Sequence, residues 1–106
     1  MTTFDDRTGG FEGKFAHDEE LRFRALHRRN KLLGQWAARR MGMSDGEVDS
    51  YAQALVMADF EHKTEADVID QVYRDLTAKN LGISRHRVQR QMEHSYDVAR
   101  QQIMTE

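Results

Sequence analysis

The sequence contains neither cysteine nor proline. The lack of cysteine excludes disulfide bonds, thiolate catalysis and zinc sites that need a cysteine ligand. The lack of proline means that no pyrrolidine ring interrupts a helix, and the seven glycines lie mainly in the N-terminal segment and at expected helix junctions. These features favour an all-α protein.

Long apolar runs are also missing. The sequence has no stretch of about 18 apolar residues that could cross a membrane. Residues 1–6 show neither the basic region nor the apolar run of a signal peptide. A length of 106 residues fits one domain with a single modest core. We therefore expect a cytoplasmic protein with no direct membrane insertion.

Three helix starts share one pattern, in which a hydroxyl residue precedes a valine by four positions. Ser44, Thr64 and Ser84 take the N-cap position in this pattern. Each is followed by apolar residues at helical spacing. Short connections between helices favour a small four-helix bundle. The last helix has a thin apolar face, so we expect it to be the least buried.

The first helix is predicted from about Asp18 to Met41, where Gly42 can end it. Acidic residues come first and basic residues follow, as the helix macrodipole favours. Its second half is the most apolar part of the chain, so Trp36 is expected to anchor the core and Gly34 to allow close helix packing.

An apolar stripe continues into the segment before this helix. At about 100° per residue its members share one helical face; they are Phe4, Phe11, Phe15, Leu26, Leu33 and Ala37. Gly9, Gly10 and Gly13 each cost an exposed helix about 1 kcal/mol relative to alanine. The pattern predicts a flexible arm, residues 1–16, on a four-helix domain, residues 17–106. Two interpretations stay open: the arm orders in a partner's groove, or its rings dock on the protein's own core.

Catalytic and metal-binding patterns were not found. The five histidines lack the spacing of a zinc-binding pair, and residues 44–49 lack the ligand spacing of a calcium loop. The glycines of the N-terminal segment do not match a phosphate-binding loop. We therefore expect no catalytic residue, no metal site and no cofactor, and a protein that is not an enzyme.

Charge is distributed unevenly along the chain, although the net charge is only −2. Residues 1–43 carry an excess of three positive charges, residues 44–76 an excess of seven negative charges, and residues 77–106 an excess of two positive charges. The basic run Arg22–Lys31 can therefore pair with the acidic middle of the chain, which favours a solvated or internally paired face over binding to RNA or anionic lipid. Contact with an acidic protein surface is a third interpretation.

Several stretches are similar to one family. They are Phe4-Asp5-Asp6-Arg7, Phe11-Glu12 with Lys14-Phe15-Ala16-His17-Asp18-Glu19-Glu20, Arg28-Arg29-Asn30-Lys31-Leu32-Leu33-Gly34 with Trp36-Ala37-Ala38, and Ala58-Asp59-Phe60-Glu61. The sequence resembles the zeta inhibitor subunit of the alphaproteobacterial F-type ATP synthase over essentially its whole length. That family usually has helix formers where this chain has Gly9, Gly10 and Gly13, a difference that bears on inhibitory potency.

The resemblance implies a four-helix protein whose N-terminal arm is mobile when free. The arm would insert as a helix at a catalytic alpha/beta interface of the synthase head, beside the central stalk, and oppose rotation in the ATP-hydrolysing direction. The partner-binding residues would be Phe4, Asp5, Asp6, Arg7, Phe11, Lys14, Phe15, Asp18, Arg22 and Phe23. The protein would then be peripheral to the inner membrane through the synthase. The resemblance also implies weak binding of adenine nucleotide in some members, for which no residue pattern here indicates a site.

Two functions are thus under consideration. The first is a regulatory inhibitor of the F-type ATP synthase that acts through its arm. The alternative is a non-enzymatic adaptor that binds nucleic acid or an acidic protein through Arg22–Lys31.

Overall fold

Four helices form the part of the chain that the structure describes. The computed structural model describes residues 4–61 and 63–106, and it describes side chains from residue 19 onward except at positions 59, 60 and 62. The helices are α1 (Phe4–Arg40), α2 (Asp45–Phe60), α3 (Glu65–Ala78) and α4 (Arg85–Thr105). The prediction of an all-α, four-helix protein is confirmed. Helix α1 begins earlier than the expected start near Asp18, so the three N-terminal glycines lie within its backbone.

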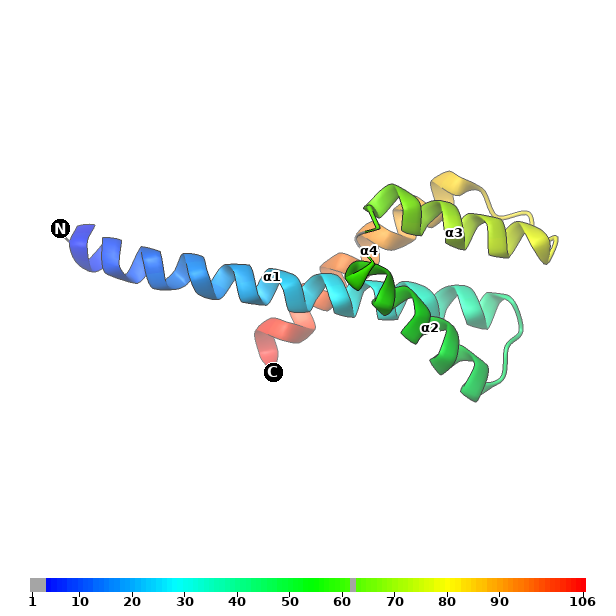
Figure 1. Ribbon diagram of the computed structural model, residues 1–106, viewed down its shortest axis with the longest axis horizontal. Coiled ribbons are helices and arrows are strands. Elements are labelled where there is room, and N and C mark those ends of the chain that lie inside the picture. The colour runs from blue at the N-terminus through cyan, green and yellow to red at the C-terminus, as the bar shows by residue number, and fades with distance from the viewer. Residues whose placement is uncertain (1–3, 62) are drawn as a thin grey trace.

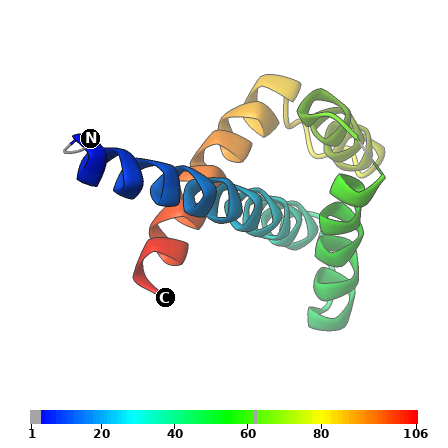
Figure 2. The ribbon, with the colours of Figure 1, turned by 60° about the vertical axis from the view of Figure 1, so that its left-hand side comes forward.

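Helix α1 is the central element of the molecule. Helices α2 and α4 both pack along it, and α3 packs chiefly on α4 (Figures 1 and 2). The N-terminal part of α1 extends beyond the other helices, which gives the molecule its elongated dimensions of 59 × 25 × 23 Å. The bundle is therefore built around the C-terminal half of α1.

The three predicted N-caps all form. The hydroxyl of Ser44 accepts a hydrogen bond from the amide of Glu47, whose carboxylate accepts one from the amide of Ser44. Thr64 and Asp67 form the same reciprocal pair, so the second capping box is also complete. Ser84 accepts from the amide of Arg87. These bonds satisfy amides that a helix start otherwise leaves without a partner.

Gly42 ends α1 as predicted. Its φ of +77° is a left-handed conformation that side chains disfavour, and the amide of Met43 reaches back to the carbonyl of Ala38 at 3.1 Å. The turn between α3 and α4 uses two such residues, Asn80 with φ of 57° and Gly82 with φ of 70°. Both turns reverse the chain, so α2 folds back across α1 at an oblique angle and α4 folds back beside α3 (Figure 1).

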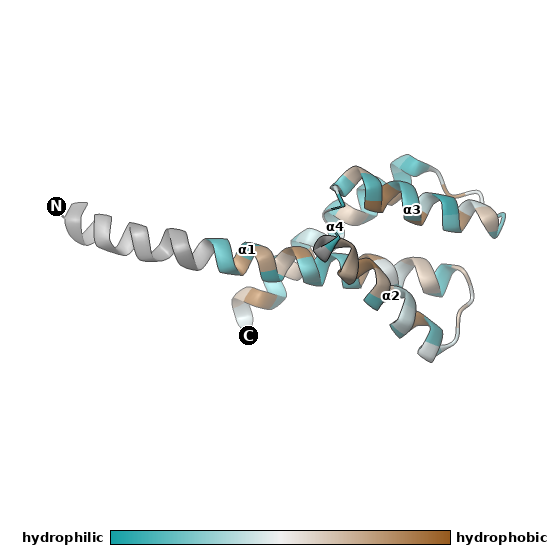
Figure 3. Ribbon diagram, in the orientation of Figure 1, coloured by the Kyte–Doolittle hydropathy of each residue, from teal (hydrophilic) through white to brown (hydrophobic). Residues whose placement is uncertain are grey.

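The core lies between the helices along the apolar faces of α1, α3 and α4 and the end of α2. Its fully enclosed members include Leu33, Val72, Leu76, Val88 and Met92. Figure 3 shows the hydrophobic stretches of α2 and of the adjoining part of α1. At Gly34 the two helices approach so closely that a Cβ atom would lie 2.7 Å from the Cα atom of Ala52. The expectation of close packing at Gly34 is confirmed.

One expectation about the core needs correction. Trp36 is only partly buried and packs against the edge of the core, where the guanidinium carbons of Arg40 and Arg87 lie 5.3 and 5.9 Å from the centre of its ring. Helix α4 buries five of its 21 residues, a smaller share than the four of 14 in α3, as its thin apolar face predicts. The five are Val88, Met92, Ser95, Ala99 and Ile103.

Candidate partner-binding surface on helix α1

Eight of the ten predicted partner-binding residues lie in the extended part of α1. Their backbone is helical from Phe4 onward, but their side chains lie outside the described residues. They are Phe4, Asp5, Asp6, Arg7, Phe11, Lys14, Phe15 and Asp18. The expectation that they contact a partner therefore stays a prediction, as does the division of the chain at residue 16.

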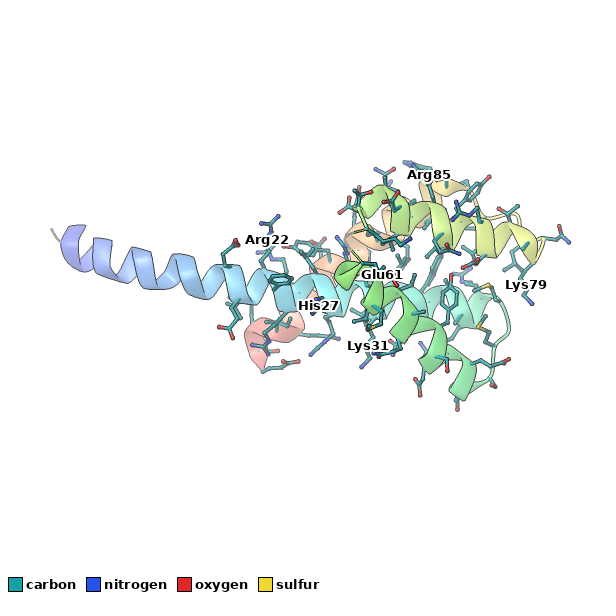
Figure 4. All side chains as sticks on the ribbon, in the orientation of Figure 1. Arg22, His27, Lys31, Glu61, Lys79 and Arg85 are labelled. Atoms are coloured by element: carbon teal, nitrogen blue, oxygen red, sulfur yellow. The ribbon has the colours of Figure 1, made fainter. Side chains whose placement is uncertain are left out.

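The other two predicted residues, Arg22 and Phe23, lie at the base of this extension. Both are exposed, and Phe23 keeps 61% of its surface accessible, an unusual value for a phenylalanine. Its ring contacts the imidazole of His27 at a centroid distance of 5.4 Å. Figure 4 shows Arg22 and His27 near the place where α1 leaves the bundle. Arg22 and Phe23 are thus two exposed side chains at the junction between the N-terminal extension and the bundle.

The C-terminal residue, Glu106, contacts the same part of α1. The carboxylate of Glu106 forms ion pairs with Arg24 at 3.0 Å and with Arg28 at 2.6 Å. Arg28 also donates a hydrogen bond to Gln102 at 2.8 Å. These pairs are partly exposed, so each contributes little to stability, about 0–1 kcal/mol. Their main effect is to hold the end of α4 beside the base of the extension.

A buried polar cluster lies one turn further along α1. The Asn30 side chain is fully enclosed and donates a hydrogen bond to the carbonyl of Leu55 at 3.1 Å. Its oxygen accepts from Arg29, whose guanidinium also pairs with Glu65 at 3.0 Å. These contacts join α1 to α2 and to the start of α3. The sequence analysis did not find this cluster, because Arg29 and Asn30 lie inside a run of charged residues that looks solvated.

The basic run Arg22–Lys31 is thus largely paired within the protein. Of its arginines, Arg24, Arg28 and Arg29 form the ion pairs described above. The preference for an internally paired face is confirmed for these three. The acidic middle of the chain supplies only one of the carboxylates, that of Glu65, and the other belongs to Glu106 in the basic C-terminal part. The order of charges along the sequence does not show which helices pack side by side in the fold.

The side chains with shifted pKa values lie outside this surface and form hydrogen bonds within the bundle. The pKa of Tyr51 lies well above its ordinary value because burial and the hydrogen bond to Asp75, 2.6 Å long, both disfavour the phenolate. Hydrogen bonds within the capping boxes lower the pKa values of Glu47 and Asp67. Within the described ranges, no group of three or more metal-ligating side chains could hold an ion. Nor is any helix there long and apolar enough to cross a membrane.

Comparison with family models gives one informative match. Residues 1–102 match the model described as ATPase inhibitor subunit zeta. The chain belongs to the ATPase inhibitor subunit zeta family. This agrees with the resemblance drawn from the sequence motifs and covers the arm as well as the bundle. Searches of curated proteins and of solved structures gave no match.

Membership of the zeta family settles the class of function. The protein is a non-catalytic inhibitor subunit of an F-type ATPase, and its partner is the F-type ATP synthase. The prediction that the chain is not an enzyme follows from this membership.

Proposed function

We propose that the extended part of α1 inhibits ATP hydrolysis by inserting, as a helix, into a catalytic alpha/beta interface of the synthase head beside the central stalk. A helix wedged at this interface would oppose rotation in the ATP-hydrolysing direction. Residues 1–16 would form the flexible inhibitory arm and residues 17–106 the domain that carries it. The contacts would come from the phenylalanine and charged residues of the arm together with Arg22 and Phe23.

The single observation that carries this proposal is the extension of α1 beyond the bundle. Residues 4–21 would form a helix about 27 Å long at 1.5 Å per residue. An isolated helix of this length is marginal in water, and three glycines weaken it further. Burial of the phenylalanine rings in a groove would offset that cost. The exposed Arg22 and Phe23 at the base would extend the same contact.

The alternative adaptor function has weaker support. It requires Arg22–Lys31 to offer an open basic face, but Arg24, Arg28 and Arg29 are engaged in ion pairs within the protein. A nucleic-acid backbone would have to displace Glu106 and Glu65 from these arginines. We therefore favour insertion of the arm and propose no nucleic-acid partner.

The test is inhibition of ATP hydrolysis by the purified synthase head, titrated with the full chain and its variants. Phe11→Ala with Phe15→Ala should weaken inhibition by about thirtyfold or more, because buried aromatic anchors dominate such interfaces. The melting temperature of the free protein should not change. The matched control is Met57→Ala with Leu81→Ala, which removes two exposed apolar side chains from the bundle surface and should leave inhibition unchanged. A phenylalanine pair that destabilised the free protein while leaving inhibition intact would place the rings in its own core.

A second variant tests whether the arm must become helical. Replacing Gly9, Gly10 and Gly13 with alanine should favour the helical form by up to about 2–3 kcal/mol, from helix propensity and reduced freedom of the unfolded arm. Inhibition should therefore tighten. Weaker inhibition by this variant would mean that the glycines are needed for close approach to the partner or for a bend.

A further inference from the structure

A basic groove with an aromatic floor lies between α1 and α4, away from the arm. It encloses about 390 Å³ and is lined by residues from the C-terminal half of α1 and the middle of α4. Its apolar floor is formed by Leu32, Trp36 and Val98, all partly buried. Trp36 is the only tryptophan of the chain. An aromatic ring left partly open in a groove is typical of binding surfaces.

The charge of this groove is of one sign. The lining includes Arg39, Arg40 and His94, and the guanidinium carbon of Arg40 lies 5.3 Å from the centre of the Trp36 ring. Arg87 lies beside the groove, with its guanidinium carbon 5.9 Å from the same ring centre. Among the described lining residues there is no carboxylate. The ion pairs between described residues use other arginines, namely Arg24, Arg28, Arg29 and Arg85. A protein with a net charge of −2 thus presents a cationic groove here.

We propose that this groove is a second docking site for the synthase, and that it binds an acidic amphipathic segment of the head. This inference rests on the proposed function for its partner. Carboxylates on one side of such a segment would meet the three arginines, while an apolar side chain would cover Trp36. Charge complementarity and the apolar floor both fit this occupant.

The groove is poorly suited to a bare phosphate group. All of its lining residues lie inside helices, where the backbone amides are already bonded, so no loop or helix start offers free amides to an anion. The guanidinium carbons of Arg40 and Arg87 lie near the indole itself, 5.3 and 5.9 Å from its ring centre. A peptide that offers both carboxylates and an apolar side chain matches this combination of charge and aromatic surface better than a compact anion does.

The position of the groove gives it a distinct role. Trp36 lies 14 positions after Arg22 in the sequence of α1, about 21 Å along the helix axis. Contact at the groove would therefore hold the bundle on the outside of the head while the arm enters the interface. Two linked contacts raise the effective concentration of the arm at its site, so the groove would raise affinity without taking part in the block itself.

The experiment uses the full chain in the same hydrolysis titration. Arg39→Gln with Arg87→Gln removes one exposed positive charge from the groove lining and one beside the Trp36 ring. It should weaken inhibition on the order of tenfold at low salt, with full inhibition still reached at saturation. The matched control, Arg74→Gln with Arg100→Gln, removes the same charge from exposed positions outside the groove and should behave like the original protein. Equal inhibition by the groove variant, the control and the original protein would overturn the proposal.

Two further outcomes distinguish failure of the proposed function from failure of the groove proposal. If the original protein does not inhibit the head at all, the proposed function fails. The groove is then tested separately, by binding the full chain with a photo-cross-linker in place of Gln91 to the head. Cross-links from Gln91 to an acidic segment would support the groove, and their absence would overturn it. Inorganic phosphate or pyrophosphate that changed Trp36 fluorescence at low millimolar concentration, and restored none of the lost inhibition, would identify an anion site instead.

Discussion

Replacing Gly34 with alanine should destabilise the protein, although alanine is the better helix former. Alanine gains about 1 kcal/mol in helix propensity over glycine. The new Cβ atom, however, would lie 2.7 Å from the Cα atom of Ala52 and 3.2 Å from the Cδ1 atom of Leu55. The nearest of these atoms belongs to the backbone, so α1 and α2 would have to move apart. Such overpacking costs about 1–3 kcal/mol or more.

The net loss in unfolding free energy should therefore be up to about 2 kcal/mol. Each kcal/mol lost should lower the melting temperature by about 4–8 °C for a domain of this size. Urea unfolding followed by circular dichroism gives the free energy directly. The matched control is Gly46→Ala in the first turn of α2, where an added Cβ meets no atom within 4 Å. The control should be neutral or more stable by up to about 1 kcal/mol. If Gly34→Ala were as stable as Gly46→Ala, the close approach of α1 and α2 would be wrong.

Two other predictions concern the polar contacts of the bundle. Asn30→Ala should lower the free energy of unfolding, measured in urea, by about 2–3 kcal/mol, because it removes an enclosed amide and leaves buried partners of that amide unsatisfied. A change below about 0.5 kcal/mol would contradict the buried cluster. The lowered pKa values of Glu47 and Asp67 mean that their contribution to stability is present above the ordinary values of 4.5 and 3.8 and is lost as the pH falls through the lower values of the folded state. Melting temperatures measured between pH 7 and pH 2 should fall less steeply for Glu47→Gln with Asp67→Asn, and an unchanged slope would contradict the capping boxes.

Local sequence signals predicted most of the fold. The three N-caps, the C-cap at Gly42 and the close packing at Gly34 each depend on a few neighbouring residues, so a single sequence contains the information. The start of α1 was less well predicted. Helix propensity disfavours a helix over the glycine segment, while the apolar stripe favours one there. The sequence alone does not show which of these two effects is larger.

The tertiary contacts were harder to predict. Trp36 was expected in the core, but its position depends on how α4 crosses α1, which no local pattern specifies. The pairing of Glu106 with Arg24 and Arg28 depends on the same crossing. The buried Asn30 was missed because its partner is a backbone carbonyl on another helix. The apolar stripe identified Phe4, Phe11 and Phe15 as candidate contacts, but their partner could be named only through the family resemblance, because a partner lies outside the chain.

The central claim, insertion of the arm into the head, is tested most directly by photo-cross-linking from position 11. The full chain, with a photoreactive amino acid in place of Phe11, is bound to the purified synthase head during ATP hydrolysis and then irradiated. The account predicts cross-links to the alpha and beta subunits at one catalytic interface, with loss of hydrolysis in the cross-linked complex. Efficient inhibition accompanied by cross-links from position 11 only to the protein's own bundle would contradict it.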